Sequence, residues 1–84
     1  MPRYFFRLAD GTILPDQDGL ELTDKHEAWS TGLGFLSDVV RIRRDSLQPG
    51  DGWSVTVTDE RNASIWRLSF QTEALAFEAA APSS

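Results

Sequence analysis

Three segments of the sequence alternate apolar and polar residues, and this period of two limits the possible folds more than any other feature. The segments are Arg3–Ala9, Trp53–Asp59 and Ser64–Phe70, and all three contain aromatic residues. Alternation of this kind is typical of strands that bury one face and expose the other. It predicts an antiparallel sheet that is covered on one side only.

Turn signals around these segments indicate how the strands connect. Asp10-Gly11 follows the first segment, and Pro15–Gly19 separates two short extended pieces at residues 12–14 and 20–22. The last two long segments are joined by Glu60–Ala63, which predicts a β-hairpin with a short loop. Along the sequence, the expected strands therefore form two groups, one before and one after a single central segment.

That central region is predicted to be a helix. Its apolar residues recur at steps of three and four, which forms one apolar stripe along a helix. Thr23 or Asp24 can cap its start, and the helix should extend roughly to Asp45. Gly32 lies on the stripe and costs about 1 kcal/mol relative to alanine. Either the helix approaches the sheet closely at this glycine, or it kinks or breaks near residues 32–34.

These elements together predict an α+β domain in ββαββ order, with one helix packed on one face of a three- to four-stranded antiparallel sheet. A chain of 84 residues has room for a single domain, which we expect over residues 1–78. The Ala-Pro-Ser-Ser end predicts a disordered tail at 79–84. The predicted core contains Tyr4, Phe6, Leu8, Leu22, Trp29, Leu33, Leu36, Val40, Trp53, Val55, Trp66 and Leu68.

Composition excludes several classes of protein. The chain has no cysteine, so disulfides, thiolate metal sites and cysteine nucleophiles are ruled out. Its net charge of −5 opposes non-specific attraction to nucleic acid and to anionic lipid. No apolar run approaches the roughly 18 residues that span a bilayer, and no signal-peptide segment is recognisable. We therefore expect a cytoplasmic protein with no membrane partner.

No group of residues predicts catalysis. His26 is the only histidine, and the sequence holds neither a Gly-x-Ser-x-Gly nucleophile motif nor a phosphate-binding loop. Three carboxylates lie close to Gly19 in the sequence, at Asp16, Asp18 and Glu21, and carboxylates at this density can bind Ca²⁺. Their spacing differs from that of an EF-hand loop, and it favours a solvated turn. We expect no enzyme activity, no cofactor and no metal.

Several short motifs resemble a known family. They are the opening Met-Pro-Arg-Tyr-Phe-Phe, Asp10-Gly11, Asp16-x-Asp18-Gly19-x-Glu21-Leu22 and Gly52-Trp53-Ser54-Val55-x-Val57-x-Asp59-Glu60. Together they resemble a family of small domains of unknown function from rhizobia and related alphaproteobacteria, over the chain from Met1 to about Phe70. The resemblance implies a bacterial, cytoplasmic, single-domain protein, and it implies no activity, cofactor, partner or catalytic residue. The helix differs, because similar proteins have Ala-rich and Glu/Arg-rich helices at this position.

The uncovered face of the predicted sheet is the candidate interaction face. It collects Arg3, Phe5, Arg7, Thr56, Ile65 and Arg67. An aromatic ring flanked by arginines can stack on bases and bind phosphates, but the acidic net charge opposes a strong nucleic-acid site. We therefore predict a non-catalytic interaction module that self-associates as a homodimer, through this face or through an edge strand. Binding of a nucleic acid or another anionic ligand to the same face is the alternative.

Overall fold

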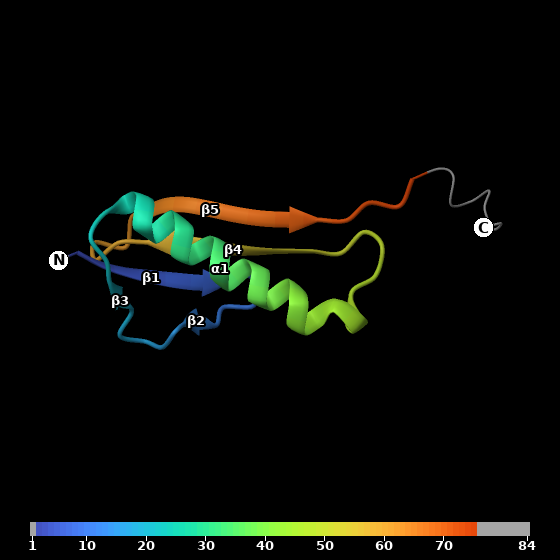
Figure 1. Cartoon of the computed structure of the whole chain (residues 1–84), viewed down its shortest axis with the longest axis horizontal. Coiled ribbons are helices and arrows are strands. Elements are labelled where there is room, and N and C mark those ends of the chain that lie inside the picture. Colours follow the sequence, from blue (N-terminus) through green and yellow to red (C-terminus); the bar gives the residue numbers. More distant parts are fainter. Residues whose placement is uncertain (1, 76–84) are drawn as a thin grey trace.

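The computed structural model describes residues 2–75 as one helix packed across one face of an antiparallel sheet (Figure 1). The elements in chain order are β1 (Arg3–Leu8), β2 (Ile13–Leu14), β3 (Leu20–Glu21), α1 (Lys25–Arg43), the 3-10 turn η1 (Arg44–Ser46), β4 (Gly52–Thr58) and β5 (Ser64–Gln71). The predicted α+β class is confirmed. The ββαββ order fits only roughly, because the predicted second strand is divided into β2 and β3.

The sheet has the order β2-β1-β4-β5, and every pair in it is antiparallel. β3 pairs with the first half of β1, and β2 pairs with its second half. Both short strands lie on the same side of β1 (Figure 1). The loop Pro15–Gly19 separates β2 from β3, so one edge of the sheet consists of two short pieces and the other edge is the long strand β5.

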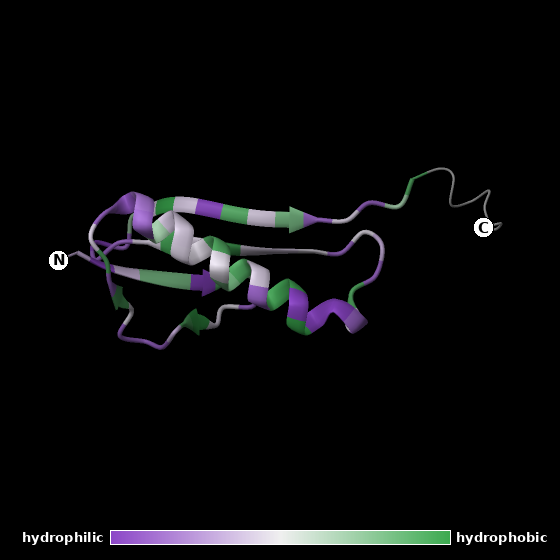
Figure 2. Cartoon of the chain, viewed as in Figure 1, coloured by the Kyte–Doolittle hydropathy of each residue, from purple (hydrophilic) through white to green (hydrophobic). Residues whose placement is uncertain are grey.

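Strand register explains the core between the sheet and α1. Phe6 lies opposite Val57, and Val55 lies opposite both Leu8 and Leu68, so these side chains share the face that α1 covers. Phe6, Val55 and Val57 are the largest side chains that are fully buried. In the second half of β5, hydrophobic and hydrophilic residues alternate in Figure 2, as the period of two predicts.

The helix lies on the sheet rotated by about one residue relative to the prediction. Ala28, Gly32, Leu36 and Val39 face the sheet, whereas Leu33 is 41% exposed. The smallest of the helix residues, Ala28 and Gly32, lie where α1 comes closest to the sheet. The bulkier side chains of the helix lie on either side of this line of contact. Half of the expected core residues are buried as predicted: Tyr4, Phe6, Leu8, Leu36, Val55 and Leu68. The prediction is wrong for Leu33 and Trp66, which are exposed. The other four are only partly buried: Leu22, Trp29, Val40 and Trp53.

Gly32 shows why the helix can approach the sheet so closely. A Cβ atom built at Gly32 would lie 3.0 Å from Leu68 Cδ1 and 3.2 Å from Val57 Cγ2. The helix is continuous through residues 32–34, so the first of the two sequence-based interpretations is confirmed. Gly34 has no atom within 4 Å of such a Cβ, and nothing in the structure explains it.

The helix starts with a cap whose residues the sequence identifies. The Asp24 carboxylate accepts the backbone N–H of Glu27, and the Glu27 carboxylate accepts the N–H and hydroxyl of Thr23. The hydrogen bonds from Thr23 lower the pKa of Glu27 below its ordinary value. α1 ends at Arg43 and continues as η1 to Ser46, close to the predicted end at Asp45.

After β5 the chain is held against the loop that precedes β4. Thr72 follows β5 and is joined to the loop after η1, since its N–H donates to the carbonyl oxygen of Asp51.

The disordered tail expected at 79–84 lies outside the described residues, as do residues 1 and 76–78 of the expected domain. Among residues 2–75, no helix is both long enough and apolar enough to cross a membrane.

Candidate interaction surfaces

The uncovered sheet face carries a transverse row made by the strand register. Arg7 of β1, Thr56 of β4 and Arg67 of β5 are directly opposite one another. Arg67 Nε donates to Thr56 Oγ1 at 3.5 Å, a long hydrogen bond. Within residues 2–75, neither Arg7 nor Arg67 has a carboxylate oxygen within 4.0 Å. The structure therefore brings together three of the six predicted face residues, and both arginines of this row lack an ion-pair partner.

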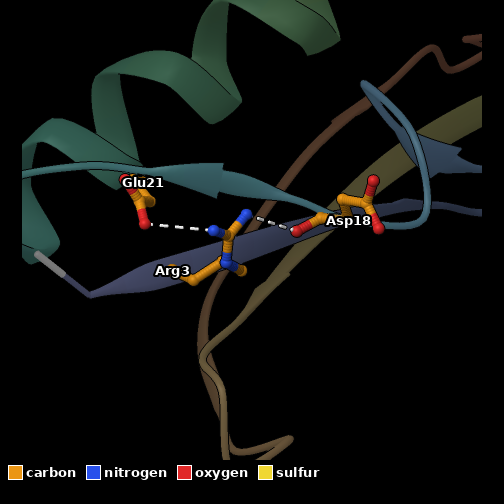
Figure 3. Close-up of polar contacts among 3 residues, drawn as sticks. All are labelled: Arg3, Asp18 and Glu21. Carbon is orange, nitrogen blue, oxygen red and sulfur yellow. Dashed lines mark hydrogen bonds and ion pairs between the residues drawn. The ribbon is translucent and has the colours of Figure 1, made fainter.

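Arg3 is engaged by its own chain. Its Nη2 lies 3.0 Å from Glu21 Oε2, which is an ion pair between residues directly opposite each other on β1 and β3. Its Nη1 donates to the carbonyl oxygen of Asp18 at 2.8 Å. Figure 3 shows one guanidinium group reaching both acceptors. Arg3 thus fixes the loop before β3, and its charge is already compensated.

Phe5 is partly covered rather than open. Gly19 has φ +75, and a Cβ there would lie 2.6 Å from the Tyr4 carbonyl oxygen and 2.9 Å from Phe5 Cδ2. Only glycine fits such an approach, because it combines a positive φ with backbone contact on the other side. The loop at residues 15–19 therefore lies against the Phe5 ring, which is half-buried. The ring is not an open platform for stacking on bases.

Ile65 also differs from the expectation of an exposed face residue. A register shift between Val57 and Thr58 leaves Ile65 without a directly opposite partner, since Thr58 pairs with Ser64 and Val57 pairs with Trp66. The Ile65 side chain is half-buried and packs against the core. A β-bulge of this kind interrupts the strict alternation from which the sequence prediction was made.

The turn between β4 and β5 places one carboxylate beside this face. Asp59 Oδ1 accepts the backbone N–H of Ala63 and of Arg61. The hydrogen bond from Ala63 is the largest cause that lowers the pKa of Asp59 below its ordinary value. A shallow groove of about 200 Å³ lies here, and Asp59, Phe5 and Arg7 are among its lining residues. Asp59 stabilises the turn, and its negative charge sits at one end of the candidate face.

The remaining candidate groups are engaged in local structure. His26 is exposed and stacks on Trp29 with ring centroids 6.1 Å apart. Asp16 Oδ1 accepts the N–H of Asp18, which closes a turn. In the described part of the chain, no three His, Cys, Asp or Glu residues are placed to hold a metal ion.

The arginines at the end of α1 contact their own chain. Arg41 pairs with Asp38 at 2.7 Å, and Arg43 lies 3.9 Å from Asp10. The Arg43 guanidinium also lies over the Trp53 ring, 4.2 Å from its centroid, which is a cation–π contact. The two contacts of Arg43 hold the end of the helix against Trp53 of the sheet and Asp10 of the turn after β1, whereas the Arg41–Asp38 pair lies within the helix.

A second surface lies on the β5 side of the molecule. The sequence prediction allowed association through an edge strand without specifying which one, and it placed Leu33 and Trp66 in the core. Within residues 2–75, β5 pairs only with β4, so its outer edge has no partner strand. Leu33 is 41% exposed and Trp66 is 38% exposed beside it. A groove of about 440 Å³ lies between α1 and β5, lined by Leu33, Leu36, Ser37, Val40, Arg41, Ser69 and Phe70. The position of β5 as the last strand of a hairpin was the one available signal.

The opposite edge of the sheet is far less suited to pairing. β2 and β3 have two residues each, and Pro15 and the loop to Gly19 interrupt them. Short, interrupted edge strands are a common protection against edge-to-edge association. β5 has eight residues, no proline and a single charge, at Arg67. In the part of the chain that the structure describes, one edge of the sheet is thus protected and the other is open.

A third surface is an apolar groove on the other side of the helix. It has a volume of about 460 Å³ and is lined by Leu8, Leu14, Pro15, Phe35, Asp38, Val39, Ile42 and Arg43. Ile42 is 74% exposed at its rim. Both grooves arise because α1 crosses the sheet diagonally (Figure 1).

Comparison with known proteins identifies the family. The model of the domain of unknown function DUF6894 matches residues 3–71, and the chain belongs to this family. No curated protein and no solved structure matches the chain. The expected membership of a family without assigned function is therefore confirmed.

Proposed function

We propose that this DUF6894 domain is a non-catalytic protein-interaction module that self-associates, and that the contact lies on its β5 side. The observation that carries the proposal is the exposure of Leu33 and Trp66 beside the outer edge of β5, which no strand within residues 2–75 pairs with. Contiguous exposed apolar groups commonly mark interaction sites. A chain of 84 residues also buries a smaller share of its surface than a larger domain, so a second copy would enlarge a small core.

Charge favours the β5 side over the uncovered sheet face. Two copies that met through the uncovered face would bring Arg7 and Arg67 of each copy into one interface, and neither arginine has a carboxylate partner among residues 2–75. Removing unpaired charges from water is unfavourable. The groove beside β5 has one arginine among its lining residues, Arg41, and this arginine already pairs with Asp38. A cytoplasmic location is part of the proposal, since a chain without cysteine suits a reducing compartment.

Light scattering over a wide range of protein concentration tests the proposal. We expect the mass of the wild-type protein to rise from that of one chain, 9.4 kDa, to twice this value. Leu33→Glu should weaken the dimer at least about tenfold, because each copy would bury a carboxylate. Ile42→Glu is the matched control, since Ile42 lies at the other groove and is 74% exposed. It should leave the dimer unchanged.

Two outcomes would contradict the proposal. One is a wild-type mass that stays at 9.4 kDa at every concentration. The other is a dimer that Leu33→Glu leaves intact and Ile42→Glu weakens, which would place the contact at the other groove and away from the β5 side. Circular dichroism on both variants checks that the helix and sheet are retained.

A second candidate function is the binding of an anionic ligand by the row of Arg7, Thr56 and Arg67. The observation that favours it is that both arginines lack a carboxylate within 4.0 Å in residues 2–75. Titration of labelled single-stranded RNA and DNA at several salt concentrations tests it. Two phosphate contacts predict a slope of log affinity against log salt of about −1.4. Arg7→Ala should weaken binding and reduce the slope to about −0.7, whereas Arg61→Ala, in the exposed turn, should change neither; absence of saturable binding at low salt removes this candidate.

A further inference from the structure

We infer that two copies of the chain join their β5 strands in antiparallel register about a two-fold axis at Leu68, which makes one continuous sheet. This inference rests on the self-association proposed above, and it specifies the partner strand, the register and the residues that meet. It follows from three features of β5: the direction of its backbone groups, the position of its one charge, and the placement of its two aromatic side chains, the exposed Trp66 and the half-buried Phe70.

The backbone of β5 offers a row of hydrogen-bonding groups at its outer edge. The N–H of Thr72 donates to the Asp51 carbonyl oxygen, one step beyond the Gly52–Gln71 pair, so Thr72 directs its backbone toward the β4 side. Backbone direction alternates along a strand. Phe70 and Leu68 therefore also face β4, and the groups that point outward belong to Arg67, Ser69 and Gln71. A strand with such a row of groups is a template for another strand.

Charge and symmetry select the register. In an antiparallel pair, directly opposite residues have their side chains on the same face of the sheet. Two identical strands related by a two-fold axis meet this condition only when the axis passes through a residue and not between two residues. The middle of β5 lies between Arg67 and Leu68. An axis at Arg67 would set two arginines directly opposite each other, which is unfavourable. An axis at Leu68 sets Arg67 opposite Ser69 of the second copy and makes these two residues a hydrogen-bonded pair through their outward groups.

The same register brings together the apolar side chains on the β5 side, which are exposed or half-buried. With the axis at Leu68, Trp66 lies opposite Phe70 of the second copy, and aromatic pairs across strands are favourable. Phe70 lines the groove of about 440 Å³ between α1 and β5, so Trp66 of the second copy is brought to this groove. Gly32 packs on Leu68, which places the neighbouring Leu33 near the axis. Leu33, Trp66 and Phe70 would all lose solvent exposure in one contact.

An axis at Ser69 is the competing register. It would set Arg67 opposite Gln71 and Ser69 opposite its own copy. This register pairs residues 67–71, whereas the axis at Leu68 pairs residues 65–71 and so uses more of the strand. Ser69 lies opposite Arg67 of the second copy in the first register and opposite Ser69 of the second copy in the other. A carboxylate introduced at position 69 therefore has opposite effects on the dimer in the two registers.

Charge variants at Ser69 test the register by sedimentation equilibrium. Ser69→Glu places a carboxylate opposite Arg67 of the second copy, twice by symmetry, and should lower the dimer Kd about 2- to 30-fold. Ser69→Arg should raise it by a similar factor. The side chain of Ser69 is exposed, so both variants should fold. Ser54→Glu is the matched control: Ser54 lies opposite Ser69 on β4, one strand away from the edge, and should leave Kd unchanged.

The outcomes separate this inference from the proposed function. If the wild type dimerises and Ser69→Glu weakens the dimer, the two carboxylates face each other and the axis at Leu68 is overturned. If both Ser69 variants leave Kd unchanged while Leu33→Glu raises it, the copies meet through helices rather than strand edges, and the inference also fails. In both cases self-association stands. A wild type that stays monomeric at every concentration overturns both.

Discussion

Gly32 sets how closely α1 approaches the sheet, and replacing it with alanine measures that contact. In a helix interior, alanine is more favourable than glycine by about 1 kcal/mol. The added Cβ would lie 3.0 Å from Leu68 Cδ1 and 3.2 Å from Val57 Cγ2. Adding a methylene-sized group to a packed core costs about 1–3 kcal/mol. Gly32→Ala should therefore change the free energy of unfolding by between about zero and a loss of about 2 kcal/mol.

Gly34→Ala is the matched control in the same helix. A Cβ at Gly34 has no atom within 4 Å, so this variant should gain about 1 kcal/mol from helix propensity alone. The corresponding rise in Tm is about 4–8 °C for a domain of this size. The stability difference between the two variants, about 1–3 kcal/mol, then reports the contact of Gly32 with the sheet.

Urea and thermal unfolding measure this difference. All proteins should be compared at one concentration, because self-association contributes to the apparent stability. Equal stabilisation by Gly32→Ala and Gly34→Ala would refute the reasoning. It would mean that α1 has room for a side chain at position 32, and that the burial of Ala28 and Gly32 does not arise from close packing.

Two further outcomes are expected from the caps and turns. Asp24→Ala removes the acceptor of the Glu27 N–H and should lower the free energy of unfolding by about 1 kcal/mol in a urea titration. The pKa of Asp59 is lowered in the folded state, mainly by the N–H of Ala63, so its contribution to stability is present at neutral pH and is lost as pH falls below about 4. Asp59→Asn should therefore reduce the acid dependence of the urea midpoint, and an unchanged dependence would show that this carboxylate does not contribute.

Local patterns were sufficient to predict most elements of the fold. The alternating segments correspond closely to β1, β4 and β5, and the cap at Asp24 starts α1 as expected. These features depend on neighbouring residues along the chain. The rotation of the helix was not predictable in the same way, because it depends on which side chains are small enough to meet the sheet at Ala28 and Gly32.

Long-range contacts account for what the sequence did not predict at the candidate face. Arg3 and Phe5 were expected to be open, but the loop at 15–19 folds back over this end of β1 and engages both. Trp66 was expected in the core, and its indole N–H instead donates to the Lys25 carbonyl oxygen at the start of α1. Each of these contacts joins segments far apart in the sequence, so no local pattern contains it.

Amide hydrogen exchange along β5 tests the central claim most directly. In a monomer, the N–H groups of Arg67 and Ser69 point away from β4 and should exchange rapidly, whereas that of Leu68 points toward β4 and serves as an internal control. Pairing of β5 strands predicts that the Arg67 and Ser69 amides become protected as protein concentration rises, while Leu68 is protected throughout. Rapid exchange of Arg67 and Ser69 at every concentration, in a sample whose mass shows a dimer, would contradict pairing through this edge.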